Sequence, residues 1–406
     1  MVDKALTFFL RFLATFLQFF IIAILSNKSD ADIFGFYFLS TAIFQIISYF
    51  LTFGFERIAF INISKYEGSS LIDIFSKTYL LYLKTLKKHF YIFIIALLIN
   101  IYFLDVSIIL NLIFLLSCFV FSLNQINSQS ILGSNSPNFG VFFGRVFYLA
   151  ILSIIFLLIN IFEIQFSYAL IILGLFLSSI ISLILSFIFI IQKFSHSNVE
   201  KNDLQINFSF DQYKIQLLNI TFQRLPILLL NIFFNDKLLI AVFSLIHSFV
   251  TIRGTILDIL TAQYGPTFIK MYSNMINKKE IIRFFRRIQF NSFVINTIYV
   301  IFVILFGNQI LSFFSNEFVS FNNLLSIYVF GNIILSIFGL SIFLDSIVNV
   351  KNSSHIRFIF IAISTLLIVS TVLVNEFQIY GLVIAIFLSW LLLNVLSYKN
   401  ILKELK

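Results

Sequence analysis

Long apolar runs, each near 20 residues and separated by short charged or turn segments, recur along the whole chain. About 20 residues of α-helix cross a hydrocarbon layer that is roughly 30 Å thick. Only 11% of the residues are charged, whereas about a quarter of the residues of a soluble globular protein are. The sequence therefore predicts an all-α polytopic membrane protein and excludes a water-soluble globular domain.

The apolar runs predict twelve membrane spans. They lie near residues 6–26, 34–62, 88–104, 108–131, 139–161, 167–192, 214–233, 238–269, 289–312, 320–348, 356–375 and 379–398. Spans two and eight are longer than the membrane requires, so we expect both to project as helix into the cytoplasm.

The most polar loop falls between spans six and seven. It predicts an N-terminal lobe of residues 1–195, a cytoplasmic linker of residues 196–213 and a C-terminal lobe of residues 214–406. "ADIFGFYFLSTAIF" at 31–44 and "DKLLIAVFSLIHSF" at 236–249 echo each other at matching places in the two halves. Two six-helix lobes around a central cavity are a common transporter plan.

Basic residues locate the two sides of the membrane. With both termini on one side, 22 of the 27 lysines and arginines lie on that side, and only Lys28 and Lys237 lie on the other. The remaining three, Arg57, Arg224 and Arg253, lie inside the membrane. Because cytoplasmic loops carry the excess of positive charge, we expect both termini in the cytoplasm.

Several arginines lie within or just inside the spans, and few acids accompany them. A charge in the bilayer costs about 2.5 kcal/mol or more, so such residues usually have a function or a partner. The guanidinium group binds phosphate oxygens in pairs and keeps its charge. A binding site for an anionic headgroup is therefore predicted, with snorkelling to lipid phosphates as the alternative. The predicted cargo-binding arginines are Arg11, Arg57, Arg224 and Arg253.

Polar residues also recur at helical spacing along four of the spans. The stripes are Arg11, Thr15 and Gln18; Gln45, Tyr49, Thr52 and Glu56; Ser122, Gln125 and Gln129; and His247, Thr251, Gly254 and Asp258. Such stripes line a wet cavity or hold helices together, and the spacing alone leaves both open. We expect Gln18, Gln45 and Gln125 to contact cargo, and Glu56 and Asp258 to serve coupling or gating. Arg253 lies off its own stripe, so either Arg253 or that stripe faces the cavity.

The sequence lacks the motifs that nucleotide binding, zinc binding and sugar-transfer catalysis would need. No "GxxxxGK[ST]" motif is present. With four histidines and one cysteine, a zinc site is not expected. The outer loops are all short, which disfavours a multispanning sugar polymerase or glycosyltransferase with a large outer catalytic loop. The sequence therefore predicts neither an enzyme nor a cofactor.

The layout resembles the multidrug/oligosaccharidyl-lipid/polysaccharide exporter superfamily, and within it the O-antigen and capsule repeat-unit flippases. The first half carries the resemblance in residues 11–66, with "GFY" at 35–37 and "TFGFERIAF" at 52–60. The second half carries it in "QRLPILLLNIFFNDKLLIAVFSL" at 223–245 and "LTAQYGPTFIKMY" at 260–272. Many family members have an acid two residues after the arginine of helix seven, where this chain has Pro226. Related flippases have cavity arginines in helices one, two and eight, which here contain Arg11, Arg57 and Arg253.

The resemblance implies a flippase of the bacterial inner membrane that moves undecaprenyl-diphosphate-linked oligosaccharides between leaflets by alternating access. Its partners would be this lipid-linked cargo, membrane lipids, a proton or cation, and a polysaccharide polymerase. No nucleic-acid partner is expected, because the positive charge follows the membrane topology. The alternative is a multidrug/cation antiporter of the same superfamily, for which a more acidic cavity is expected.

Overall fold

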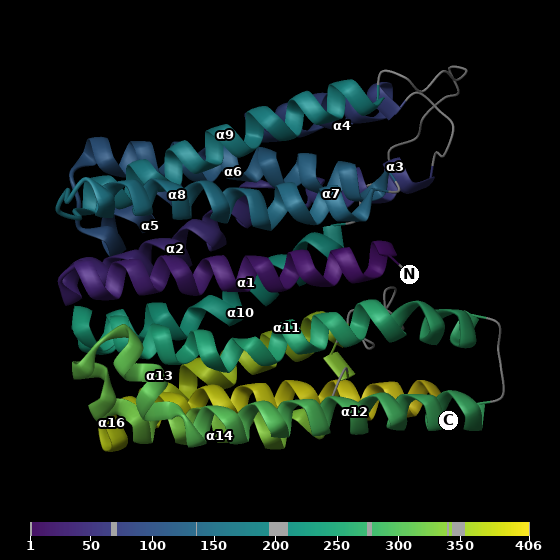
Figure 1. The fold of residues 1–406 in the computed structure, drawn as a ribbon. Helices are drawn as coiled ribbons and strands as arrows, with labels where there is room; N and C mark the ends of the chain where they lie inside the picture. The colour runs from purple at the N-terminus through teal and green to yellow at the C-terminus, as the bar shows by residue number, and fades with distance from the viewer. Residues whose placement is uncertain are drawn as a thin grey trace. The chain divides into compact units, whose positions relative to one another are not determined.

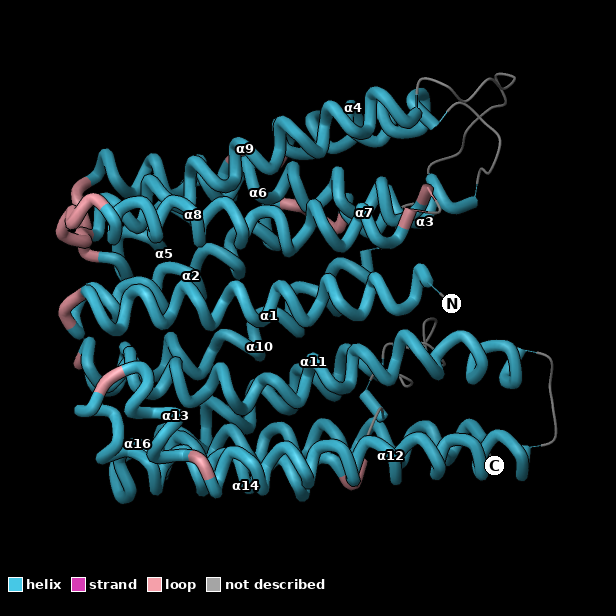
Figure 2. The backbone as a smooth tube through the Cα atoms, in the orientation of Figure 1, coloured by secondary structure: helices cyan, strands magenta, loops and turns pink. Residues whose placement is uncertain are grey.

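The structure is a computed structural model that describes residues 2–65, 71–134, 136–194, 210–273, 278–338, 341–342 and 354–405. Within these ranges the secondary structure is helical, and no strand occurs (Figures 1 and 2). The chain divides into two compact units, Met1–Arg224 and Leu225–Lys406. The predicted linker 196–213 lies mostly outside the described residues, and the six-plus-six division stays a prediction.

Unit 1 is built around one central helix. That helix, α6 (Ile108–Gly133), packs against helices from across the unit, above all α9. The others before it are α1 (Val2–Lys28), α2 (Ala31–Leu51), α3 (Phe55–Lys65), α4 (Leu71–Lys88) and α5 (Tyr91–Leu104). After it come α7 (Pro137–Val141), the π-helical turn η1 (Phe142–Val146), α8 (Phe147–Ile161), α9 (Tyr168–Phe194) and the first part of α10 (Phe210–Phe234). Figure 1 shows α8 running along both α1 and α9.

Unit 2 begins within α10 and continues through a second set of helices. These are α11 (Lys237–Ser273), α12 (Lys278–Leu305), α13 (Gly307–Phe314), the short 3-10 helix η2 (Asn316–Phe321), α14 (Asn322–Ser336) and α16 (Ser354–Leu405). Helix α14 packs against α11, α12 and α16, so it is the centre of this unit.

The helices match the predicted spans in number. Ten of the described helices are long and apolar enough to cross a membrane, and the bent pair α4–α5 makes an eleventh. Helix α16 is 52 residues long, more than twice what a membrane needs, and its backbone leaves helical geometry at Gln378. Counting α16 as two spans gives twelve, and the all-α polytopic fold is confirmed.

Many large apolar side chains of these helices are exposed. Examples are Phe12 on α1, Leu98 on α5, Ile154 on α8, Ile184 on α9 and Ile298 on α12. A soluble protein does not expose this much apolar surface in contiguous patches, whereas a bilayer covers it. The chain is therefore a multi-pass membrane protein.

Span three is predicted over 88–104, and helix α5 occupies residues 91–104 of it. The helix before it, α4, meets α5 at an angle of 71°. Helix α4 carries Lys77, Lys84, Lys87 and Lys88, which are costly in hydrocarbon. Helix α5 has 14 residues, fewer than a complete span needs.

Span two is also interrupted. A continuous helix is predicted over 34–62, but α2 ends at Leu51 and α3 begins at Phe55. Phe53 and Gly54 between them have φ angles of 52° and 78°. The hydroxyls of Tyr213 and Tyr82 donate to the carbonyl oxygens of Phe50 and Leu51, at 3.1 and 3.2 Å. The two tyrosines thus satisfy acceptors that a buried helix end would otherwise leave unpaired.

Replacing Gly54 by alanine is expected to destabilise this break. A Cβ there would lie 2.7 Å from the Cβ of Tyr213, and the positive φ disfavours any side chain. We expect a loss of about 2 kcal/mol in unfolding free energy, measured as a lower thermal midpoint of the purified protein in detergent. The matched control is Gly254→Ala, because a Cβ on Gly254 would meet no atom within 4 Å. Equal midpoints for both variants would contradict the prediction.

Candidate functional site

Arg224 and Gln45, two predicted cargo residues of different spans, meet in unit 1. The Nε of Arg224 on α10 donates to the Oε1 of Gln45 on α2, at 2.6 Å. Both side chains are half-buried. Tyr37 and Tyr49, also on α2, are close enough to Arg224 to interact with its charge. Gln45 therefore orients the guanidinium group without neutralising it.

A second arginine, Arg145, lies near Arg224 and Gln45. It lies on η1 with its side chain exposed, and η1 leads into α8, where Tyr148 stacks on Phe44, the neighbour of Gln45, with ring centroids 5.9 Å apart. Arg145 therefore lies in the same part of unit 1 as Arg224, close enough for the two charges to interact. Among the described residues, neither Arg145 nor Arg224 has an acidic partner. We call Arg145 and Arg224 the arginine pair. The Glu56 carboxylate also interacts with Tyr49, but among the described residues it pairs with neither arginine. Two like charges near each other favour an anion between them.

Helix α1, which carries Arg11 and Gln18, also borders η1. Leu10 and Ala14 of α1 pack against Val141 and Val146 on the two sides of the π-helical turn. The side chains of Arg11 and Gln18 are half-buried. Their role as cargo contacts stays a prediction.

The π-helical turn is held by buried polar side chains of α6. A π-helix bonds each N–H to the carbonyl five residues back, so carbonyls near it lose their usual α-helical donors. Ser128 donates to the Gly140 carbonyl at 3.0 Å, and Gln125 donates to the Gly144 carbonyl at 3.2 Å. Asn124 donates to a third carbonyl, that of Phe143, at 3.1 Å. We call Asn124, Gln125 and Ser128 the polar ladder.

Further side chains extend this network behind the ladder. Ser182 of α9 also donates to the Phe143 carbonyl, at 3.3 Å. Ser186 donates to Asn124 at 3.0 Å and accepts from Asn127 at 2.9 Å. All of these side chains are buried, so water cannot reach their polar atoms, and the hydrogen bonds within the protein satisfy them instead. Of the predicted stripe of α6, Gln125 thus holds α6 against η1, and its sugar contact stays a prediction.

Glu56 and Arg57 point into different surroundings, as adjacent helical residues must. Glu56 is 2% exposed, and among the described residues neither carboxylate oxygen has a hydrogen-bond partner. Arg57 is half-buried, with its guanidinium carbon 5.2 Å from the centre of the Phe60 ring. The coupling role of Glu56 and the cargo role of Arg57 stay predictions.

Arg253 faces the interior of unit 2. Its side chain is 6% exposed, and Nη2 donates to the Leu335 carbonyl at 3.0 Å and contacts Asn394 Oδ1 at 3.5 Å. On the same helix Thr251 and Gly254 are exposed. The face of α11 that carries Thr251 and Gly254 is therefore exposed, and the face that carries Arg253 is buried.

The other members of the α11 stripe are not alike. His247 is buried, and its Nδ1 lies 2.7 Å from the Tyr328 hydroxyl. The side chain of Asp258 lies outside the described residues, so its coupling role stays a prediction.

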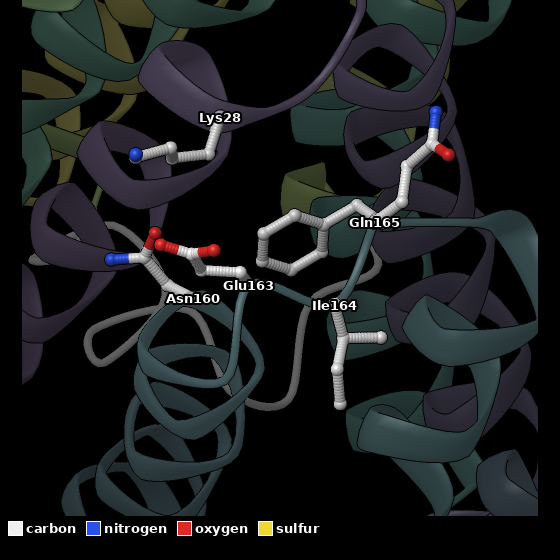
Figure 3. Close-up of a pocket in the computed structure, with 6 residues that line it drawn as sticks. Lys28, Asn160, Glu163, Ile164 and Gln165 are labelled. Carbon is white, nitrogen blue, oxygen red and sulfur yellow. The ribbon is translucent and has the colours of Figure 1, made fainter.

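Two cavities lie away from all of these residues. In unit 2, a cavity of about 320 Å³ is lined by Lys279, Ile282, Arg283 and Arg286. In unit 1, one of about 330 Å³ lies between the end of α1 and the α8–α9 connection. Figure 3 shows Lys28, Asn160 and Glu163 on one side of it and Gln165 on the other. Its lining mixes both charge signs, so it does not select an anion as the arginine pair does.

Sequence patterns did not select Arg145 as a cargo residue, nor did they select Asn124, Gly140 of α7 or Gly144 of η1. One signal was available, since Gly140 and Gly144 form a G-x-x-x-G pattern inside an apolar span. Such a pattern allows two membrane helices to approach closely. A Cβ on Gly140 would lie 2.8 Å from the Cγ of Leu132 on α6. The pattern thus marks where α6 approaches η1.

Several solved structures share the fold over nearly the whole chain. One is an outward-facing multidrug resistance MATE family transporter of the MOP superfamily, with a TM-score of 0.69, 14% identity, and coverage of 100% of this chain and 96% of that one. An inward-facing transporter of the same description has a TM-score of 0.68 and 13% identity, covering 97% and 94%. A MOP superfamily transporter from Pyrococcus furiosus, described as having a binding pocket of reverse polarity that suggests a different function, has a TM-score of 0.64 and 11% identity, covering 99% and 95%.

No family model matches the sequence, and no curated protein matches it either. Identities of 11–14% establish a common fold and no more. The chain therefore has the fold of the MATE transporters of the MOP superfamily, and its cargo has to be argued from its own residues.

Proposed function

We propose that this protein is an alternating-access transporter that moves an undecaprenyl-diphosphate-linked oligosaccharide across the bacterial inner membrane. The observation that carries the proposal is the arginine pair, which has no acidic partner among the described residues. Guanidinium groups match the geometry of phosphate oxygens and are less strongly hydrated than an ammonium, so they suit a phosphate in a partly dry site.

The remaining predicted residues have parts in the same proposal. Arg11 and Arg57 meet the diphosphate as it arrives, and Gln18 and Gln45 contact sugar hydroxyls. The termini lie in the cytoplasm, the polyprenyl tail stays in the lipid, and a polysaccharide polymerase receives the product. Arg253 joins the cargo path only in a conformation in which its contacts to Leu335 and Asn394 open.

A multidrug/cation antiporter is the second candidate. The comparisons favour it, because two of the neighbours above are described as multidrug resistance transporters. The charge of unit 1 favours the anionic cargo, because a second arginine beside Arg224 repels a cationic drug. The Pyrococcus furiosus transporter, by its description, combines the fold with a binding pocket of reverse polarity.

Complementation separates the two candidates. The full chain is expressed in one strain that lacks its polysaccharide flippase and in another that lacks its multidrug antiporter. We expect surface polysaccharide to return in the first strain, and drug resistance to stay at the empty-vector level in the second. Restored resistance without polysaccharide would overturn the proposal in favour of the antiporter.

Glu56→Gln is expected to separate stability from transport. A buried carboxylate without hydrogen bonds costs free energy when ionised, so a neutral amide of the same shape should leave the thermal midpoint unchanged or raise it. A glutamine cannot carry a proton, so gradient-driven transport should be lost. Both are read from one preparation, by thermal unfolding in detergent and by transport in proteoliposomes. Full transport by Glu56→Gln would remove Glu56 from the coupling mechanism.

A further inference from the structure

The π-helical turn interrupts a helix that would otherwise cross the membrane without a break. It lies within the span Asn138–Ile161, and α-helix continues on both sides of it. A π-helical turn contains about one residue more than an α-helical turn. Residues after it are therefore rotated by about 100° relative to an uninterrupted helix. The direction of Arg145, which is next to the end of the turn, depends on this extra residue.

The turn is stabilised from outside the helix. Four side chains, the polar ladder and Ser182, donate to the carbonyls of Gly140, Phe143 and Gly144. A carbonyl that lacks its α-helical N–H partner has both lone pairs free, so it is a better acceptor for these buried donors than a carbonyl of a regular α-helix. The donors therefore favour the π-helical form over the α-helical one.

The arginine pair has hydrogen-bonding capacity to spare. Gln45 accepts from Nε of Arg224, and among the described contacts the two terminal nitrogens of that guanidinium have no partner. Arg145 is exposed and likewise has no described partner. Each arginine can thus present a fork of N–H donors to one phosphate group, and two arginines suit two linked phosphates.

We propose that the polar ladder holds the π-helical turn so that Arg145 stands beside Arg224, and that the arginine pair binds the two phosphates of one diphosphate. The inference rests on the proposed function and deepens it. It adds Arg145 as a binding residue, and Gln125, Asn124, Ser128 and Ser182 as positioning residues. These four act through Arg145 and do not touch the anion.

Equilibrium binding to the purified full chain in detergent tests the proposal. The probes are geranylgeranyl diphosphate, the uncharged geranylgeraniol and inorganic diphosphate. We expect Arg145→Ala and Arg224→Ala each to weaken binding of geranylgeranyl diphosphate about ten-fold. The exposed Lys84 lies on another helix, so Lys84→Ala is the matched control and should bind as wild type does. Geranylgeraniol binding should be the same in all variants.

A double-mutant cycle tests positioning. Gln125→Met keeps the volume and removes the donor to the Gly144 carbonyl. We expect it to weaken diphosphate binding about as much as Arg145→Ala does, and to add nothing when Arg145 is already alanine. Should Gln125→Met not fold, Ser182→Ala removes a donor to the same turn and replaces it in the cycle.

Three results would overturn the inference. Wild-type affinity in Arg145→Ala would remove Arg145 from the site, and an equal loss from Gln125→Met in both backgrounds would show that Gln125 does not act through Arg145. If inorganic diphosphate competes with geranylgeranyl diphosphate equally well in wild type and in Arg145→Ala, the anion binds elsewhere. Failure of flippase complementation with this cycle intact would overturn only the proposed function.

Discussion

Arg253→Ala is expected to unfold unit 2 at a clearly lower temperature than wild type. The guanidinium group donates to the carbonyl of Leu335, one residue before the end of α14, to which the Phe338 N–H also donates, at 3.3 Å. A cation at a helix C-terminus also interacts favourably with the helix dipole. Losing this buried charged hydrogen bond should cost about 3 kcal/mol.

Lysine and methionine variants sharpen this prediction. Arg253→Lys keeps the charge but lacks the planar fork that reaches both Leu335 and Asn394, so we expect a partial loss. Arg253→Met keeps much of the volume and should be as unstable as alanine if the hydrogen bonds matter more than packing. Thermal unfolding followed by the emission of Trp390 measures all three, because this single tryptophan lies on α16, one turn from Asn394.

The same series decides between two roles for Arg253. Thr251→Ala is the control for the thermal midpoint alone, because its exposed side chain lies on the same helix and belongs to the stripe that is a candidate for the cavity wall. An alanine variant with the wild-type midpoint and no transport would make Arg253 a cargo contact, as its predicted depth in the membrane suggests. A lower midpoint, with transport proportional to the amount of folded protein, would make it a structural residue of unit 2.

Gly144→Ala is expected to disrupt the approach of α6 to η1. A Cβ on Gly144 would collide with the Oγ of Ser128, which is buried and hydrogen-bonded to the Gly140 carbonyl. Overpacking at such a place costs about 3 kcal/mol when neither backbone can move. The variant should show a lower thermal midpoint and weaker diphosphate binding together.

A second-site change should recover part of the loss. Ser128→Gly removes the colliding atoms, so the double variant Gly144→Ala with Ser128→Gly should unfold at a higher temperature than Gly144→Ala alone. Recovery will be incomplete, because glycine within a helix costs about 1 kcal/mol and the bond to Gly140 is lost. If Ser128→Gly lowers the midpoint equally with and without the Gly144 change, the two residues do not collide.

Much of the fold could be predicted from run length and charge alone. Twelve apolar runs of membrane length leave few alternatives to a polytopic helical protein, because backbone polar groups in lipid must pair within helices. The break at residues 52–54 was harder to predict, since "TFG" interrupts neither the apolar character nor the length of the run. Its one signal was that the run exceeds the thickness of the membrane.

The candidate site could be predicted less completely. Position within the apolar spans selected Arg11, Arg57, Arg224 and Arg253 alike, but this position carries no information about direction. Gln45 makes Arg224 part of a half-buried polar face, whereas Leu335 and Asn394 draw Arg253 into the core of unit 2. These partners lie 82 to 179 residues away in sequence, beyond the reach of any local pattern. A π-helical turn leaves hydropathy unchanged, so nothing in composition marks it.

The extra residue of η1 also bears on how the chain tolerates insertions and deletions. Deleting one residue from a membrane span normally rotates everything after it by about 100° and exposes core residues to lipid. Within Phe142–Val146 the loss of one residue would instead turn a π-helical turn into an α-helical one. A homologue shorter by one residue here would therefore have a regular α-helix at this place and would keep helix α8 in the same rotation. In an alignment, a single gap at this position would mark the presence or absence of the turn, and with it the placement of Arg145.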